Sequence, residues 1–525
     1  MINQEQCWSR IKLVPVLLLL IVCSPVYSQL WIRTFDGPAH WQDMYYAMAL
    51  DPLGNVVATG FTQIIVAQET VPFLLTAKYD PDGNRQWLRV QDRGSGLAVA
   101  CDRNGNIYVT GSCTEETGGL TIKYYPDGNI AWIRSDGFFF WGSDIITDRN
   151  GDIYVTGSVS DSLNPIVQYA VTVKYGSDGS LKWMRVDSTG DWTGAIGLDS
   201  LGNVYVAGDD SGPAYLVMKY SPDGRLLWRQ GSNLRGYGMS IAVSPNGDVY
   251  VTGSLGYGSY DAIATVKYSS DGEEQWVRIY DGPGWDYGYP VVIDNEGNCY
   301  VTGASGTQPG PWPLFDFVTI KYSPAGEELW VRRYDGSGKD DFPFAITTDF
   351  EGNVYIGGWS QVPQDSINYK ADYTLLKYDP SGNLLWEARY SGPDNLGGAI
   401  YSIAIDNNNY IYTAGQVFIG PRERYSYDAC IIKYPPDGPG IAEFRASRPS
   451  AFFVLAPNPA VGYFSVTGAV GLKAVRLYDI AGKLVRVYQP VNAGSRFSLE
   501  RIPAGVYLVK LQTPDREITR KLVVR

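Results

Sequence analysis

The side chains best able to do chemistry in this sequence are aspartates expected in loops between short strands. They are Asp209, Asp210, Asp286, Asp316, Asp340 and Asp341. Two carboxyl groups held at a suitable separation can act as acid and base in glycoside hydrolysis. The sequence gives no such separation, and exposed loop carboxylates are usually solvated. We therefore assign no catalytic residue.

Other reactive side chains are scarce. His40 is the one histidine among 525 residues, which disfavours a Ser-His-Asp triad and a His-rich metal site. We predict no cofactor and no metal site. Cys101, Cys299 and Cys430 stand where sibling repeats carry mainly Val, Ile, Leu or Thr, so we expect buried thiols and no disulfide framework.

Tryptophan gives a more specific hypothesis about binding. Six of the 15 tryptophans are expected in loops of variable length on one face: Trp41, Trp141, Trp192, Trp285, Trp312 and Trp359. Phe138, Phe139, Phe140, Tyr287 and Phe342 are expected with them. Such rings could form a stacking platform for sugars or peptide side chains. The alternative is that they fill gaps between structural units and cover the core.

Internal repeats are the strongest pattern in the chain. The sequence "DRNGNIYVTGS" at residues 102–112 returns as "DRNGDIYVTGS" at 148–158, and related copies bring the number of units to eight. The units recur about every 50 residues, a period typical of propellers. The D-x-x-G-N segments lack the length and terminal Glu of a calcium-binding EF-hand, so we interpret them as turns.

Each unit is predicted to contain four strands. The third strand ends in Lys-Tyr in every unit, and a turn containing Gly leads to a fourth strand built on Trp-x-Arg. We interpret this Lys and Arg as contacts between neighbouring units. The eighth unit has Ala442 where the others have Trp, whereas residues 30–33 (LWIR) stand alone near the N-terminus. We predict that they complete the eighth unit and hide its open edge.

The recurring G-N-x-Y-V-T-G and Lys-Tyr-x-x-x-G-x-x-x-Trp patterns resemble those of SBBP repeats, a β-propeller repeat family of secreted bacterial proteins. The resemblance implies an all-β propeller and supplies no catalytic motif. The family is named for seven blades, and this chain has eight units. We therefore expect an eight-bladed β-propeller over residues 29–438, with four strands per blade and a ring closed by the N-terminal strand.

A different pattern begins near residue 451. Pro457-Asn458-Pro459, "VRLYDIAGKLVRVY" at 475–488 and "IPAGVYLVKL" at 502–511 precede the final "RKLVVR". Alternating strands indicate a small Ig-like β-sandwich over residues 451–525, after a linker at 439–450. The three motifs resemble the C-terminal sorting domain of Por, or type IX, secretion cargo, which implies the outer-membrane secretion machinery as a partner. An ordinary adhesion-type sandwich is the alternative.

Residues 1–28 have the pattern of a signal peptide. Arg10 and Lys12 precede an apolar run, and cleavage is expected between Ser28 and Gln29. A lipoprotein at Cys23 is the weaker alternative. No second apolar stretch is long enough to span a membrane, so we expect no transmembrane segment in the mature chain.

The charge distribution excludes one class of partner. The formal net charge is −12, although residues 448–525 carry twelve Lys and Arg against four Asp and Glu. An acidic body argues against nucleic-acid binding. We therefore predict a secreted or cell-surface protein, exported through the periplasm, that binds a glycan or protein without catalysis or serves as a scaffold. The alternatives are an extracellular propeller hydrolase or lyase acting on polysaccharide, and a purely structural surface protein.

Overall fold

The structure is a computed structural model whose described part is entirely built from β-strands. It describes residues 30–524, except 114–117, 136–140, 161–167, 189, 211–213, 257–261, 310–312, 364–368, 421–425, 439–453, 468–473, 480–482, 489–495 and 513–516. Within these residues there are 37 strands and no helix. The expected all-β fold is confirmed.

The repeats form six antiparallel sheets in chain order. The first contains β2 (Asp43–Leu50), β3 (Val56–Val66), β4 (Glu69–Tyr79), β5 (Arg85–Cys101), β6 (Ile107–Cys113), β7 (Gly118–Tyr124) and β8 (Ile130–Arg134). The second contains β9 (Trp141–Thr147), β10 (Ile153–Ser160), β11 (Gln168–Tyr175) and β12 (Leu181–Asp187). The third contains β13 (Gly190–Leu198), β14 (Val204–Asp210), β15 (Ala214–Tyr220), β16 (Leu226–Val243), β17 (Val249–Leu255), β18 (Ala262–Tyr268) and β19 (Glu274–Tyr280).

The remaining three sheets have four strands each. One contains β20 (Asp286–Ile293), β21 (Cys299–Gly306), β22 (Phe315–Tyr322) and β23 (Glu328–Tyr334). The next contains β24 (Asp341–Thr348), β25 (Val354–Pro363), β26 (Tyr369–Tyr378) and β27 (Leu384–Tyr390). The last combines β28 (Gly398–Ile405), β29 (Ile411–Ile419) and β30 (Ser426–Tyr434) with β1 (Trp31–Phe35) from the other end of the chain.

Two long strands explain why two of the sheets have seven strands. The first half of β5 pairs with β4 and its second half, from Gly94, pairs with β6. In the same way, β16 pairs with β15 and then, from Gly236, with β17. Each of these strands therefore serves as the fourth strand of one repeat and the first strand of the next.

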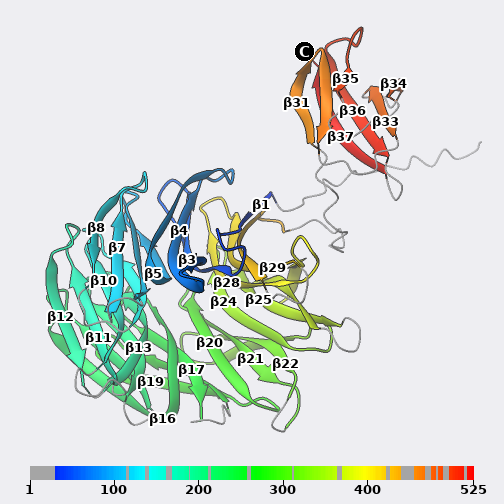
Figure 1. Ribbon diagram of the computed structural model, residues 1–525. Helices are drawn as coiled ribbons and strands as arrows, with labels where there is room; N and C mark the ends of the chain where they lie inside the picture. Colours follow the sequence, from blue (N-terminus) through cyan, green and yellow to red (C-terminus); the bar gives the residue numbers. More distant parts are fainter. Residues whose placement is uncertain are drawn as a thin grey trace, which may run out of the picture.

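The predicted pairing of the N-terminal strand with the last repeat is confirmed. β1 runs antiparallel to β30, with Trp31 opposite Lys433 and Phe35 opposite Ala429. The last sheet also contacts the first, because β28 to β30 lie against β2. Figure 1 shows the sheets following one another in chain order, so that the last, in yellow, lies beside the first, in blue.

The sequence repeats are visible in the strand boundaries. All eight Lys-Tyr pairs end a third strand, as predicted, at Tyr79, Tyr124, Tyr175, Tyr220, Tyr268, Tyr322, Tyr378 and Tyr434. The turns between first and second strands also follow the prediction. In the first of them, Asp51 accepts hydrogen bonds from the backbone N–H groups of Leu53 and Asn55, which fixes the turn.

Neighbouring repeats are joined by the Trp and Lys that the sequence pattern singled out. Seven indoles donate from Nε1 to a backbone carbonyl in the turn before the next fourth strand, at 2.9–3.2 Å: Trp31, Trp87, Trp132, Trp183, Trp228, Trp276 and Trp330. In all eight repeats the Lys of Lys-Tyr donates to the corresponding carbonyl, at 2.7–3.4 Å. The predicted contact between units is confirmed.

This contact requires a glycine in the turn whose carbonyl accepts the hydrogen bonds. Its φ angle lies between 78° and 85° in all eight repeats. A Cβ atom there would lie 2.6–2.8 Å from the indole of the preceding repeat. Arg89, two residues after Trp87, donates from Nε to the carbonyl of this glycine, Gly128, at 2.8 Å. The turn is therefore shaped both by its backbone and by the ring packed on it.

The eighth of these junctions is less complete. Trp386 is followed by Glu387 and Ala388 in place of the usual arginine. Its indole nitrogen is buried and donates to none of the described residues, although the ring packs on the turn of Gly438. Lys377 still donates to the carbonyl of Pro436, at 3.2 Å.

The chain beyond residue 453 forms a further all-β unit. It contains β31 (Val454–Val461), β32 (Tyr463–Thr467), β33 (Ala474–Asp479), β34 (Leu484–Tyr488), β35 (Arg496–Ser498), β36 (Gly505–Gln512) and β37 (Glu517–Val524). Phe464 and Phe497 share one buried cluster with Val475, Val509 and Leu511. This unit therefore has a core of its own.

We predict that Gly128→Ala destabilises the protein more than the matched change Gly420→Ala. Both glycines have a φ angle near 80°, but a Cβ at Gly128 would collide with the Trp87 ring, whereas no described atom lies within 4 Å of one at Gly420. Overpacking should cost Gly128→Ala about 2 kcal/mol more. Chemical denaturation followed by tryptophan fluorescence measures the difference, and equal losses would show that the ring does not depend on the glycine.

Candidate functional site

The loops that enter three first strands are anchored by buried aspartates. Asp43, Asp286 and Asp341 each begin a first strand and are at most 1% exposed. Oδ2 of each accepts a hydrogen bond from the backbone N–H of a glycine four to six residues earlier in the chain, at 2.6–2.7 Å. The carboxylates therefore hold the loops in place, which is a structural use.

Burial also changes the ionisation of these groups. It raises the pKa of Asp341 to about 6, although the hydrogen bond from Gly336 acts in the opposite direction. Burial raises the pKa of Asp286 as well. Neither side chain has exposed surface with which to touch a substrate. Their raised pKa values therefore follow from burial, and the anchoring hydrogen bonds oppose the rise.

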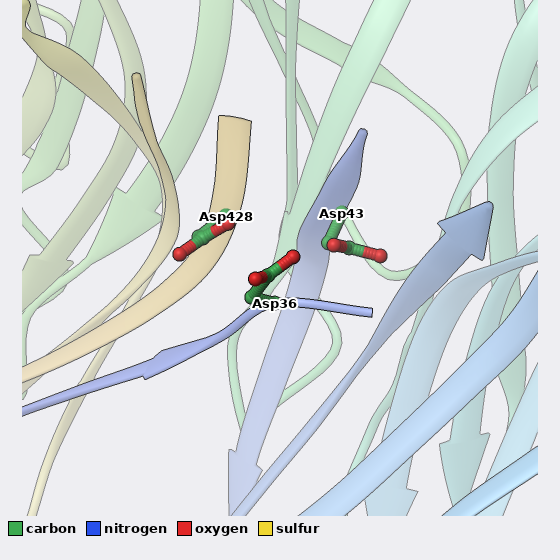
Figure 2. Close-up of side chains that lie close together, drawn as sticks. All are labelled: Asp36, Asp43 and Asp428. Atoms are coloured by element: carbon green, nitrogen blue, oxygen red, sulfur yellow. The ribbon is translucent and has the colours of Figure 1, made fainter. Parts of the chain in front are cut away.

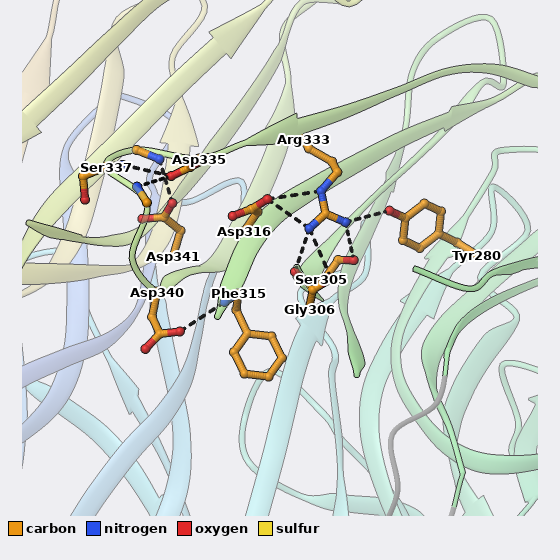
Figure 3. A network of polar contacts seen from close by, with 12 residues as sticks. Tyr280, Ser305, Gly306, Phe315, Asp316, Arg333, Asp335, Ser337, Asp340 and Asp341 are labelled. Atoms are coloured by element: carbon orange, nitrogen blue, oxygen red, sulfur yellow. Dashed lines mark hydrogen bonds and ion pairs between the residues drawn. The ribbon is translucent and has the colours of Figure 1, made fainter. Parts of the chain in front are cut away.

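Asp316 belongs to an ionic network with Arg333 (Figure 3). The guanidinium donates to Asp316 Oδ2 from Nε at 3.2 Å and from Nη2 at 2.9 Å. It also donates to the Ser305 hydroxyl at 2.6 Å and to the Tyr280 hydroxyl at 3.1 Å. Burial raises the pKa of Asp316, and the pairing with Arg333 opposes that rise. A carboxylate whose charge is paired with a guanidinium in this way is poorly placed to act as a nucleophile or base.

The other predicted acids also have structural contacts. Asp340 accepts the backbone N–H of Phe315 at 3.1 Å, and Asp209 accepts that of Gly238 at 3.0 Å. Asp209 and Asp210 end β14, in a different sheet from Asp316, Asp340 and Asp341. The prediction that all six lie in loops is wrong, because the hairpins extend beyond the repeated residues and five of the six lie within strands.

The histidine is at the surface. His40 lies in the loop between β1 and β2, and its side chain is 77% exposed. Its Nδ1 lies 2.6 Å from Asp36 Oδ2, and this contact raises the pKa of the imidazole.

Four aromatic rings form a continuous row where the two sheets β20–β23 and β24–β27 adjoin. Phe315 lies 5.4 Å from Tyr287 and 5.0 Å from Phe342, and Phe342 lies 5.0 Å from Trp359, measured between ring centroids. All four side chains are half-buried, so each packs on its neighbours and keeps part of its surface in solvent. We call these four residues the aromatic row.

A hollow adjoins one end of the aromatic row. Its volume is about 290 Å³, near the lower end of the range for small-molecule sites. It is lined by Tyr237, Met239, Ser254, Tyr287, Gly288 and Tyr289. Tyr287 therefore belongs both to the hollow and to the row.

A second set of rings follows the first strands. Tyr289, Phe344, Tyr401 and Tyr46 are consecutive neighbours, with centroids 5.7, 5.3 and 6.3 Å apart. Each lies at a bulge in a first strand. The first strands contact one another from sheet to sheet, so these rings line the inner side of the sheets. We call them the inner arc.

Five of the six predicted tryptophans lie within the described residues. Trp41 and Trp285 lie in loops before β2 and β20, and Trp359 belongs to the aromatic row. Trp312 lies outside the described residues, as do Phe138, Phe139 and Phe140 and the predicted cleavage position at Ser28 and Gln29. The prediction that all six lie in loops is wrong for Trp141, Trp192 and Trp359, which stand in strands β9, β13 and β25 because these hairpins are long.

Sequence reasoning missed several residues of these two sets. Phe315 was not predicted, and no member of the inner arc was. A usable signal existed for the inner arc, because Tyr46, Tyr289, Phe344 and Tyr401 each stand five residues before the first-turn aspartate of their repeat. Aligning the repeats on that aspartate would have found them.

Two family models match the chain. The model described as a beta-propeller repeat (SBBP) matches residues 329–363, and the one described as a secretion system C-terminal sorting domain (Por_Secre_tail) matches residues 454–525. Both resemblances inferred from the sequence are confirmed, and the chain contains a propeller. The sorting domain marks proteins that the type IX system exports, so the protein is directed to the cell surface or the extracellular space.

Individual relatives are distant. An uncharacterized WD repeat-containing protein of Acanthamoeba polyphaga mimivirus is 25% identical over 27% of this chain, and the match spans 13% of that relative's length. The Dos1 propeller is 9% identical, with 75% of this chain and 94% of that chain covered and a TM-score of 0.48. PorZ, described as an essential surface component of the type IX secretion system of Porphyromonas gingivalis, is 10% identical, with 94% and 100% covered and a TM-score of 0.21.

Among the described residues, no helix is of a length and apolarity that would let it cross a membrane.

We predict that Arg333→Gln lowers the free energy of unfolding by about 2 kcal/mol. This loss lies between the contribution of an exposed ion pair and the cost of removing one partner of a buried pair. The loss arises because Asp316, only 8% exposed, is left without its cation. Adding Asp316→Asn should recover part of the loss, since the unpaired charge is removed. Denaturant unfolding of the two single variants and the double variant measures this. A double variant no more stable than Arg333→Gln would contradict the account.

Proposed function

We propose that the protein is a secreted or cell-surface binding protein, without catalytic activity, that recognises a glycan or a protein through its propeller. The observation that carries the proposal is the aromatic row beside the hollow lined by Tyr287. Half-buried rings fixed by packing on each other offer contact area at a low cost in conformational entropy. Aromatic rings are also the side chains most often responsible for binding energy at interfaces.

The carboxylates near the aromatic row favour binding over catalysis. A glycosidase needs two carboxyl groups that reach the scissile bond. Asp286 and Asp341 are 0% exposed and anchor loops, and Asp316 is paired with Arg333. The alternative, an extracellular polysaccharide hydrolase or lyase, would need acids with free access to the substrate.

The architecture we propose for the binding unit is an eight-bladed propeller over residues 29–438. Support comes from the eight Lys-Tyr third strands and from β5 and β16, each of which serves two repeats. The pairing of β1 with β30, and the bonds from Trp31 and Lys433 to the carbonyl of Pro81, support closure of the ring by the N-terminal strand. We further propose a linker at 439–450 and an Ig-like sandwich at 451–525.

The proposed export route has two steps. Cleavage between Ser28 and Gln29 accompanies passage across the inner membrane. Residues 451–525 then interact with the outer-membrane secretion machinery, for which the sorting-domain match at 454–525 is the support. The propeller is the cargo that this route delivers.

We predict that Phe342→Ala and Trp359→Ala each weaken ligand binding about tenfold or more, as expected for central aromatic contacts. The matched control is Phe418→Ala, which removes a half-buried ring that packs on Tyr427 in the last sheet. Mature chains from Gln29 to Arg525 would be screened against arrays of polysaccharides and of surface proteins, with melting temperatures measured in parallel.

The same screen distinguishes the competing functions. Binding that is lost in folded Phe342→Ala and Trp359→Ala, and kept in Phe418→Ala, supports the proposal and identifies the ligand class. Release of shortened or unsaturated sugars would show an enzyme instead. Binding that survives in both Phe342→Ala and Trp359→Ala would show that the aromatic row does not bind the ligand.

A further inference from the structure

Three aspartates from opposite ends of the chain meet beside β1. Asp36 follows β1, Asp43 begins β2 and Asp428 lies on β30. One carboxylate oxygen of each lies within 4.8 Å of the others. Figure 2 shows the three side chains approaching from these separate segments. We call this group the seam cluster, because it lies where the N-terminal strand joins the last sheet.

Within the part of the chain that the structure describes, no basic side chain pairs with Asp428. Its side chain is 7% exposed, no described residue donates a hydrogen bond to it, and its Oδ1 is fully buried. Asp43 is 1% exposed and uses Oδ2 to accept the Gly37 N–H. Asp36 is partly exposed and pairs with His40 at the surface, which leaves the cluster open to solvent on that side.

A buried carboxylate without a partner is costly, and the ionisation of Asp428 reflects this. Burial, followed by the nearby charges of Asp36, Asp43 and Asp394, raises its pKa to about 7, while His40 has the opposite effect. A cation in the cluster would remove this cost.

The repeat architecture shows how another repeat solves the same problem. Asp316, Asp335 and Asp341 form an equivalent group of three carboxylates (Figure 3). Asp316 and Asp428 each stand six residues before the Tyr of Lys-Tyr. Asp335 and Asp36 each stand five residues after the Trp of the fourth strand. In the first group, Arg333 neutralises Asp316 at 2.9 Å.

The seam cluster lacks that arginine. Arg333 stands three residues after Trp330, and the residue three after Trp31 is Thr34. The strand registers agree, because Arg333 is opposite Val318, two residues beyond Asp316, and Thr34 is opposite Cys430, two residues beyond Asp428. Thr34 is therefore the structural counterpart of Arg333.

In the other repeats, an aspartate at the third-strand position of Asp428 is found together with a basic side chain that pairs with it. Asp372 occupies the same third-strand position and pairs with Lys370 at 3.0 Å. In the repeat before Asp316, both members are missing, with Ala262 in the position of the acid and Ile279 in that of the arginine. Of the three carboxylates at this position, Asp428 is the one that no basic side chain of the described residues contacts as an ion pair.

We infer that the seam cluster binds a calcium ion through Asp36, Asp43 and Asp428. Carboxylate oxygens are the ligands that Ca²⁺ prefers, and water reaching the exposed side through Asp36 can complete its coordination. Zinc sites are typically built from histidine and cysteine. The three inferred ligands here are all carboxylates, and the neighbouring His40 is an exposed side chain paired with Asp36. The ion would replace the guanidinium that the equivalent group contains.

A bound ion would also join the two ends of the propeller. Asp36 and Asp43 belong to the N-terminal segment, and Asp428 belongs to the last repeat. Calcium outside the cell would therefore stabilise the attachment of β1 after export, since a ligand that binds only the folded state stabilises that state.

The test is calorimetric titration of Ca²⁺ into the chelator-treated mature chain, residues 29–525. We expect one ion per chain to bind with a dissociation constant of roughly 10⁻⁴–10⁻³ M, the class of extracellular modules, and to raise the melting temperature. Thr34→Arg keeps all three carboxylates and supplies the missing cation, so it should weaken this binding at least about tenfold. Asp428→Asn should do the same.

Asp335→Asn, which changes the counterpart of Asp36 in the compensated group, is the matched control and should leave binding unchanged. Folded Thr34→Arg protein that no longer responds to Ca²⁺ supports the site. The inference is overturned if the wild-type chain binds no Ca²⁺ at millimolar concentration. It is equally overturned if binding persists in both Thr34→Arg and Asp428→Asn, because the ion would then be held elsewhere on this acidic chain.

Discussion

The structure depends on one repeated contact, in which an indole from one repeat packs on a glycine turn of the next. The indole N–H and the Lys of Lys-Tyr both donate to one carbonyl of that turn, as Trp87 and Lys78 do to Pro126. Each such bond contributes about 1 kcal/mol, and the buried ring adds to this. Because the donors and the acceptor belong to different repeats, the contact fixes the position of each repeat relative to its neighbour.

This contact leaves the opposite ends of the sheets free to vary. The tight turns have little freedom, since their glycines carry both a positive φ angle and a packed ring. The loops that enter the first strands are held separately, by buried aspartates such as Asp286 and Asp341. A rigid framework with individually anchored loops is the arrangement on which binding surfaces are usually built, and the aromatic row lies at that end of two adjacent sheets.

The sequence predicted those features that spacing within one repeat determines. Third strands ending in Lys-Tyr and Trp in the fourth strands follow from short turns of fixed length. The pairing of residues 30–33 with the last repeat follows from the Trp that the eighth unit lacks. The extent of the hairpins did not follow, because pairing such as Trp359 with Tyr373 lies beyond the repeated residues. The seam cluster was also beyond prediction, since Asp36 and Asp428 become neighbours only when β1 joins β30.

The most direct test of this account is removal of residues 29–35, which deletes β1 with its Trp31 and Arg33. Hydrogen exchange of the mature chain and the truncated chain would be compared strand by strand, together with the melting temperature. The account predicts a clear fall in melting temperature and loss of protection in β30, whose partner is gone, and in the turn at Pro81–Gly83, which loses its indole. Unchanged exchange in β30 and an unchanged melting temperature would contradict it.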